Sequence, residues 1–525
     1  MASNRVFQQI SALRPGRSTF DLSYDKIMTA DMGFLYPVMI KEAIPGDRFK
    51  LSTQVMARMN PTIKPILHEI NIYQHTFFVA YRNLMQNDDF RKYLTGGDDG
   101  KDDTVVLPTW PDESVGYGTL GDYLEIPPGL NPGTADLKPH AFPLMAFNNI
   151  YNEYYRNINF IEEVDLFDTS MKKRCWERDY FTSSLPFQQR GTPPSLPIAG
   201  TTAALWDTSP KPLLSATTGT TNDGQAYADT GPTFVDQLTV GPSIAGKYPF
   251  RISLSEMNNN TVDLAANTFN IADLRLAFQI QKWMERNARA GTRYTEYIKA
   301  HFGPGVAPRD DRLDRPEYIG GNKTPLIINP IRQTTPTDIV PDVTPQGNLA
   351  GEGVSVDNGF IGSYLVREYG IIMTIMSIMP RSAYQQGVDR SWIKETRYDF
   401  YTPEFANLSE QAVWPAEVYA DGTAADRGPI PFGYQGRWDE LRTSKNQTAG
   451  LMRSGAPTSL DYWHLARDFG STRPILNQSF IECTPDKDRI FAVPSEPGFV
   501  MHVGNRIVAS RPLPYASNPG LIDHH

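Results

Sequence analysis

The segment that comes nearest to a known chemical motif is Gly241–Tyr248, whose glycine and lysine spacing is that of a phosphate-binding loop. Such a loop needs backbone amides around the phosphates and a Ser or Thr after the lysine to hold Mg²⁺. Here Pro242 removes one amide, and Tyr248 takes the place of the hydroxyl residue. We expect no strand before this segment and no helix after it. We therefore interpret it as a surface turn and not as a nucleotide site.

The histidines and cysteines form no recognisable metal or nucleophile motif. The sequence at His68 begins like a zincin helix, but an isoleucine occupies the position of the second histidine ligand. Cys175 and Cys483 have no histidine nearby in the sequence, and two cysteines cannot supply a disulfide framework. We expect His464 to be a packed or hydrogen-bonded core residue. The sequence therefore predicts no enzyme, no cofactor and no metal site.

Basic residues close to aromatic ones are the remaining candidates for binding chemistry, because cations hold phosphates while aromatic rings stack on bases. Three arginines lie in the first twenty residues, which contain no acid, and four more cations lie near Tyr384, Trp392 and Tyr398. We predict that these residues face DNA, with ordinary surface and interface cations as the alternative. The seven candidates are Arg5, Arg14, Arg17, Arg381, Arg390, Lys394 and Arg397.

Length and composition describe a large globular protein. The chain has 525 residues, of which 40% are hydrophobic and 21% charged, so wholesale disorder is excluded. Its formal charge of -9 argues against a protein that acts alone by neutralising phosphates. The N-terminus lacks the apolar region of a signal peptide, and the longest apolar run, 371–379, is about half of a membrane span. We expect a soluble protein made in the cytosol.

The elements that position these residues are mostly short strands. Glycine (40) and proline (42) are spread along the chain and separate short β-branched and aromatic runs. Short strands joined by long irregular connections are typical of a sandwich or jelly roll with large loops. The predicted strands are 48–57, 70–81, 370–379, 398–401, 489–493, 499–503 and 505–509.

Helices are fewer. Asn270 can cap a helix over 270–289, whose wide apolar arc predicts burial on more than one side. A second helix is predicted over 292–302, because Gly303-Pro304-Gly305 is a strong terminator. Shorter helices are predicted at 142–155 and 460–469.

One stretch, 191–267, differs from its surroundings. It is rich in Thr, Ala, Ser, Gly and Pro, and its basic residues are Lys211, Lys247 and Arg251. This composition is typical of a solvent-facing excursion from a denser framework.

Taken together, many segments resemble a single protein family. They include RSTFDLS at 17–23, DYFTSSLPF at 179–187 and RYDFY at 397–401. The others are 35–51, 274–282, 292–296, 301–303, 315–321, 345–349, 384–387 and 519–524. In these segments, which span nearly the whole chain, the sequence resembles the major capsid proteins of the Microviridae, small icosahedral single-stranded DNA phages, and specifically the gokushovirus branch.

The resemblance implies a mainly β fold, an eight-stranded antiparallel jelly roll of the viral capsid type with very long inter-strand loops and a few helices. It also implies about sixty copies that close a T=1 shell around circular single-stranded DNA. The implied partners are an internal scaffolding protein, a DNA pilot protein, a small basic DNA-binding protein and a host surface receptor. The implied location is the virion, assembled in the cytoplasm of a bacterial host.

The resemblance also suggests a division of the chain. Residues 1–190 and 268–525 would form the jelly-roll core, with the basic arm at the N-terminus and the buried helix 270–289 in the second part. Residues 191–267 would form a protrusion at the three-fold axes that contributes to host attachment. Its predicted receptor-facing residues are Trp206, Tyr227, Phe234, Lys247 and Tyr248. The alternative is a carbohydrate-binding or carbohydrate-active β-sandwich protein.

Overall fold

The computed structural model divides the chain into two compact units. One unit consists of Met1–Gln188 with Ala288–His525, and the other of Gln189–Asn287. The described residues are 16–516 without 87, 103, 112, 131–136, 195–200, 204–225, 229–236, 241–250, 254–260, 264–270, 304–314 and 335–346.

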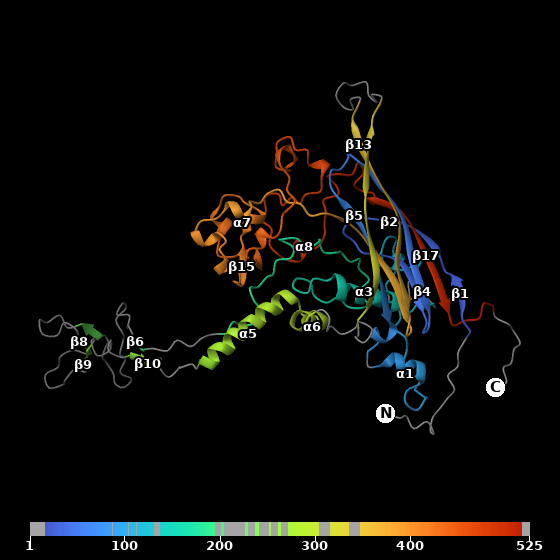
Figure 1. Ribbon diagram of the computed structural model, residues 1–525, viewed down its shortest axis with the longest axis horizontal. Helices are drawn as coiled ribbons and strands as arrows, with labels where there is room; N and C mark the ends of the chain where they lie inside the picture. The colour runs from blue at the N-terminus through green and yellow to red at the C-terminus, as the bar shows by residue number, and fades with distance from the viewer. Residues whose placement is uncertain are drawn as a thin grey trace, which may run out of the picture. The chain divides into compact units, whose positions relative to one another are not determined.

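The first unit is built on two antiparallel sheets (Figure 1). The six-stranded sheet has the order β1-β17-β4-β13-β12, and β2 also pairs with β17. Its strands are β1 (Ser18–Asp21), β2 (Tyr24–Ala30), β4 (Arg48–Thr62), β12 (Ile327–Arg332), β13 (Leu349–Leu365) and β17 (Phe499–Arg511). The four-stranded sheet has the order β11-β5-β14-β3. Its strands are β3 (Tyr36–Ala43), β5 (Ile70–Ala80), β11 (Glu317–Pro325) and β14 (Gly370–Pro380).

The connections between the sheets are those of a jelly roll. The chain alternates between the sheets from β2 through β3 and β4 to β5, and β17, near the C-terminus, pairs with β2 and β4. The predicted fold class is confirmed. The number of strands differs from the predicted eight because β1 and β12 lengthen the six-stranded sheet. Between β11 and β12, the backbone N–H of Leu326 donates to Ile70 (2.8 Å) as the chain crosses from one sheet to the other.

The alternation of side chains along each strand builds the core between the sheets. From residue 48 to residue 59 of β4, residues at odd positions such as Phe49, Val55 and Met59 are buried, and those at even positions face outward. Val55 and Met59 pack in one cluster with Val38 and Ile72 of the other sheet, and Phe49 packs in a second cluster with Met39 and Phe78. Removing these side chains from water supplies most of the stability of the sandwich.

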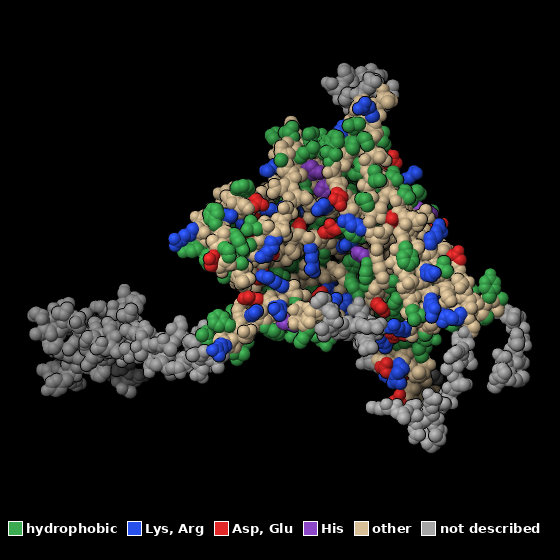
Figure 2. All heavy atoms as spheres, in the orientation of Figure 1, with side chains coloured by type: hydrophobic (Ala, Val, Ile, Leu, Met, Phe, Trp, Pro, Cys, Tyr) green, Lys and Arg blue, Asp and Glu red, His purple; other side chains and the backbone are tan. Residues whose placement is uncertain are grey.

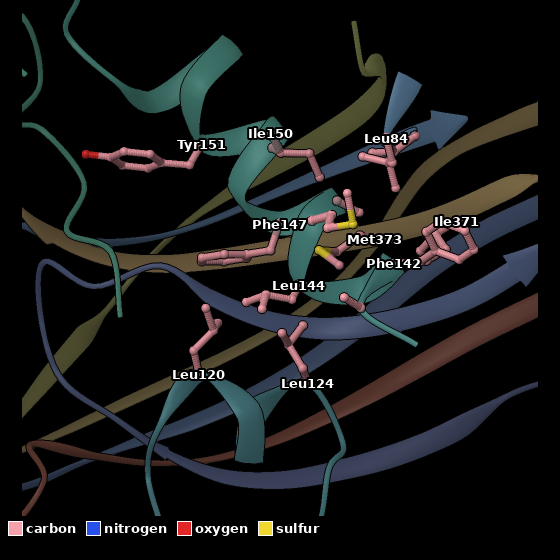
Figure 3. Packing of buried hydrophobic residues seen from close by; sticks show 14 of the residues in the cluster. Leu84, Leu120, Leu124, Phe142, Leu144, Phe147, Ile150, Tyr151, Ile371 and Met373 are labelled. Carbon is pink, nitrogen blue, oxygen red and sulfur yellow. The ribbon is translucent and has the colours of Figure 1, made fainter. Parts of the chain in front are cut away.

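The other face of the four-stranded sheet is buried under helices. These are α1 (Asp89–Thr95), α2 (Leu120–Tyr123) and α3 (Phe142–Ile150), and α3 continues as a π-helical turn, Tyr151–Tyr155. The helix predicted over 142–155 is therefore confirmed. Figure 3 shows the side chains of α3 gathered against Ile371 and Met373 of β14. Because it is covered on both faces, β14 is buried along its whole length, which explains its uninterrupted apolar run.

The long connection between β14 and β17 has a core of its own. It contains the hairpin β15 (Glu410–Val413) and β16 (Gly433–Gly436), and the short helices α7 (Pro415–Val418) and α8 (Gln478–Ile481). These elements surround a cluster that includes Phe181, Tyr384 and Phe432. We call this connection, residues 381–498, the loop layer.

The second unit holds short strands and most of helix α5. Its strands are β6 (Thr201–Ala203), β7 (Ala226–Ala228), β8 (Gln237–Val240), β9 (Arg251–Ser253) and β10 (Thr261–Asp263). Helix α5 (Ile271–Ala290) begins directly after Asn270, as predicted, and α6 (Tyr294–Phe302) of the first unit ends at Gly303, whose φ of 94° no helix tolerates. The expected burial of α5 on more than one side is not observed, because Leu276, Phe278 and Trp283 are exposed.

Several predicted elements are wrong. Residues 398–401 are not a strand, since Asp399 accepts from the Thr396 backbone N–H (2.8 Å) and closes a 3₁₀ turn. Residues 489–493 form a turn in which the Ile490 N–H donates to Lys487 (3.1 Å). Only a 3₁₀ turn, Asp461–Trp463, lies within the predicted helix 460–469. The two strands predicted over 499–509 are one continuous strand, β17.

Candidate interaction surfaces

The structure separates the cations that were predicted to face DNA. Arg390 lies inside the loop layer, where its guanidinium is 2.9 Å from Glu417 and 3.7 Å from Glu440. It also donates to the carbonyl of Ala412 (2.6 Å). The Glu417 side chain is fully buried, and this burial raises the pKa of its carboxyl despite the arginine beside it. Arg390 is therefore engaged by internal carboxylates.

Lys394 and Arg397 lie among exposed aromatic rings. The Lys394 ammonium is 4.7 Å from the centre of the Phe400 ring, and the Arg397 guanidinium is 4.9 Å from that of Tyr398. Four large side chains of this region are exposed, and Trp392 is the most exposed of them at 81%. We call this surface the aromatic shelf. It consists of Trp392, Tyr398, Phe400 and Tyr401.

Arg381 lies away from these residues and lines a cavity. Its guanidinium is 3.1 Å from Glu69, and its carbonyl oxygen lies 2.5 Å from Nε2 of His68. The cavity has a volume of about 390 Å³ and is also lined by Trp463 and His464. Burial lowers the pKa of both histidines, which keeps the imidazoles neutral.

Arg17 links three nearby segments of the first unit by hydrogen bonds. Its guanidinium donates to the carbonyl oxygens of Gly46 and Ser510 (3.3 Å for the latter), so it joins the start of β1 to the turn before β4 and to the end of β17. Arg5 and Arg14 lie outside the described residues. Among the predicted receptor-facing residues, Tyr227 lies in β7. The others, Trp206, Phe234, Lys247 and Tyr248, lie outside the described residues.

The histidine and cysteine residues considered above as possible catalytic or metal-binding groups have the surroundings of structural residues. His464 is buried, with Nε2 2.5 Å from the Met452 carbonyl and Nδ1 accepting from the Ala466 N–H (3.0 Å), which confirms the predicted core histidine. Cys175 and Cys483 are both free thiols. In the part of the chain that the structure describes, no three His, Cys, Asp or Glu side chains meet in a way that could hold a metal ion. The loop 241–248 lies outside that part.

The exposed face of the six-stranded sheet is a surface that was not predicted from the sequence. Its outward side chains on β4 include Arg48, Lys50, Gln54 and Arg58. Figure 2 shows basic side chains spread over the region where β4 and β17 run in Figure 1. The signal was present in the sequence, because the strict alternation of 48–59 places every cation of β4 on the face opposite to the core.

Comparisons with known proteins show the family to which the chain belongs. Residues 8–521 match the family model described as capsid protein (F protein). The chain belongs to this family. The capsid protein VP1 of Chlamydia phage 1 is 30% identical over 600 aligned residues that cover 98% of this chain and 97% of the relative. VP1 of Bdellovibrio phage phiMH2K is 32% identical, with 93% and 92% covered, and VP1 of Spiroplasma virus 4 is 28% identical, with 96% and 95% covered.

The resemblance to gokushovirus capsid proteins is thereby confirmed. This major capsid protein is a structural component of the virion that assembles with copies of itself, and it is not an enzyme. The match over most of the chain also decides against the carbohydrate-active alternative. Among its described helices, none is long and apolar enough to cross a bilayer.

Proposed function

We propose that this capsid protein closes into a T=1 shell of about sixty copies around a circular single-stranded DNA genome. The observation that carries the proposal is the amount of large apolar surface that a single chain leaves exposed. The aromatic shelf is one example, and Tyr117 (90% exposed) and Ile430 (79%) are others from distant parts of the first unit. Such side chains are typical anchors of protein interfaces, where neighbouring subunits cover them.

The long connections support the same conclusion. The loop layer has a small core and short elements, yet it carries Trp392, Ile430 and Ile475 on its surface. A monomeric protein gains nothing from exposing these residues, whereas a shell subunit has several different neighbours to contact. Lys394 and Arg397 would then lie at an interface between subunits, where Arg in particular is enriched.

The nature of the enclosed genome can be tested directly. Particles assembled with the viral partners are treated with nuclease, and the protected nucleic acid is then extracted. A circular single strand resists exonucleases but is cut by a single-strand-specific endonuclease. Protected nucleic acid that is double-stranded, linear or RNA would contradict the proposal.

The stretch 191–267 is proposed as the protrusion that contributes to host attachment. Support comes from its composition and from the separate compact unit, Gln189–Asn287, that contains it. Replacing 195–267 by a short Gly/Ser linker should leave particles of full size that attach poorly to host cells. Failure to assemble would instead make the segment part of the shell framework.

The remaining partners are proposed by resemblance. They are the internal scaffolding protein, the DNA pilot protein, the small basic DNA-binding protein and a host receptor, with assembly in the bacterial cytoplasm. A small basic protein would complement a shell protein with a net charge of -9. Replacing Arg5 and Arg14 by glutamine should reduce packaged DNA more than particle yield, and an equal loss of both would make the N-terminal arm an assembly element.

A further inference from the structure

The outward face of the six-stranded sheet carries unpaired positive charge at its centre. Arg48, Lys50 and Arg58 project from β4, which lies between β17 and β13. All three side chains are exposed, and none forms an ion pair with a described residue. The strand from 48 to 62 contains no acid, although acids outnumber bases in the whole chain by 59 to 50. We call these three residues the basic strip.

The acids on this face form no ion pair with the basic strip. One of them, Glu352 of β13, lies close to the strip, two residues from the residue that faces Arg58 in the strand register. Asp25 is on β2, which pairs with β17 and not with β4, and it is already paired, since its carboxylate is 3.4 Å from Arg506 and 3.7 Å from His502. Asp21 lies on β1 opposite Val508, at the edge of the sheet. The three cations of β4 therefore form no ion pair with a described residue, and their charge is available to an anionic partner.

The groups around the basic strip suit nucleobases. The strand registers place Ile27, His502, Met56 and Val356 in one row across β2, β17, β4 and β13. The next row contains Gln54 and Asn358, whose amides can both donate and accept hydrogen bonds. Phe360, directly opposite Ser52, is 66% exposed and offers a ring for stacking.

We propose that this sheet face binds single-stranded DNA, with the phosphates on the basic strip and the bases over the apolar and amide rows. The inference rests on the proposed function, because it assigns to one surface of the chain the genome that the shell encloses. A duplex hides its bases, so it would use the cations but not Phe360 or the row from Ile27 to Val356. Single strands use both kinds of group, and a broad, shallow face is open to a flexible strand.

The assignment differs from the one made from sequence. The predicted DNA-facing cations Arg390 and Arg381 are paired with carboxylates of the same chain. Arg48, Lys50 and Arg58 have no such partner, so their charge is available to phosphates. The difference arises because ion pairing depends on residues far away in the sequence, such as Glu417 for Arg390.

The test compares two triple variants that each remove three positive charges. The first is Arg48→Gln, Lys50→Gln and Arg58→Gln. The matched control, Lys101→Gln, Lys138→Gln and Arg453→Gln, removes three exposed cations that lie away from the sheet. Subunits dissociated from particles are titrated with a fluorescent oligothymidylate at several salt concentrations, and thermal unfolding checks that both variants remain folded.

We expect the basic-strip variant to bind more weakly, with a salt slope reduced by about 2, since each phosphate contact on a single strand contributes about 0.7. The control should keep the slope of the unaltered protein. A basic-strip variant that binds like the control, or an unaltered subunit that does not bind the oligonucleotide, would overturn the proposal.

Particle assembly separates this inference from the proposed function. Particles of the basic-strip variant should reach full mass but contain less DNA than those of the control. If the variant binds the oligonucleotide normally but cannot assemble, the face is a contact between proteins and the inference is wrong. If the unaltered chain binds DNA through the basic strip but forms no closed shell, the proposed function fails while the surface assignment stands.

Discussion

The Arg390 guanidinium lies 2.9 Å from the fully buried carboxylate of Glu417. This pair joins the 3₁₀ turn Arg390–Trp392 to helix α7 within the loop layer, and Glu440 adds a second carboxylate at 3.7 Å. Removing the arginine would leave a buried negative charge without its partner, which is one of the most destabilising changes a folded protein can suffer.

We therefore predict that Arg390→Met lowers the free energy of unfolding of the subunit by about 3 kcal/mol. The matched control is Arg397→Met, seven positions away, whose side chain is exposed. The control should change stability by no more than about 0.5 kcal/mol. Urea unfolding of the dissociated subunit measures both, and equal stabilities of the two variants would show that the ion pair is dispensable.

The sequence could not distinguish Arg390 from Arg397. Both lie near aromatic residues, and only the position of Glu417, brought close by the loop layer, makes one internal and the other exposed. By contrast, the outward side of β4 follows from local alternation alone, because a period of two fixes the face of every residue. The strand predicted at 398–401 failed because a local side chain, Asp399, satisfies backbone donors better than a neighbouring strand could.

A second prediction concerns acid stability. His75 of β5 lies among aromatic rings, with Nδ1 2.8 Å from the Tyr155 hydroxyl. Burial, helped by the charge of Arg174, lowers the pKa of His75 to about 4. Between pH 6.5 and about 4 the unfolded chain binds a proton that the folded chain does not, so folding stability falls as the pH is lowered through this window.

We expect the titration of this histidine to lower the free energy of unfolding of the subunit by about 3 kcal/mol between pH 7 and pH 4. This value follows because each unit of pKa shift corresponds to about 1.4 kcal/mol. The variant His75→Gln should show a shallower fall in stability, and the exposed control His140→Gln should follow the unaltered protein. Chemical unfolding at several pH values provides the measurement. A pH profile that His75→Gln leaves unchanged would contradict the assignment.

A third prediction concerns the thiols. Burial raises the pKa of Cys175 to about 11 and that of Cys483 well above its ordinary value. Since the thiolate is the reactive form, iodoacetamide at about pH 8 should label the native subunit very slowly and the unfolded chain at both positions. Mass spectrometry after timed exposure counts the labels. Rapid labelling of either cysteine in the native subunit would show that its burial is transient.

A fourth prediction tests the aromatic shelf. Trp392 contributes little to the fold of one chain because 81% of it is exposed, whereas a buried tryptophan at an interface commonly contributes about 2 kcal/mol or more. Trp392→Ser should therefore leave the unfolding free energy of the subunit within about 0.5 kcal/mol and reduce the yield of particles by tenfold or more. The exposed neighbour Glu404 provides the control Glu404→Gln. Normal assembly of the Trp392→Ser variant would show that the aromatic shelf is not a contact between subunits.

The sequence predicted the fold class, the helices α3, α5 and α6, and the structural role of His464. Each of these depends on residues that are close together in the chain. The exposure of α5 could not be predicted. Its wide apolar arc predicts burial but does not indicate whether the same chain or another subunit buries it. Leu276 and Phe278 are exposed in the single chain. In a protein that assembles, an apolar pattern describes the complete shell better than it describes one subunit.

The measurement that tests the central claim most directly is the absolute mass of the assembled, nuclease-treated particle, obtained by light scattering coupled to size separation. Sixty chains of 58.9 kDa predict a protein mass of about 3.5 MDa, with the enclosed genome in addition. A single species of that mass would support the closed T=1 shell. A stable species of one to a few chains under conditions that permit assembly, or a particle with a different number of copies, would contradict it.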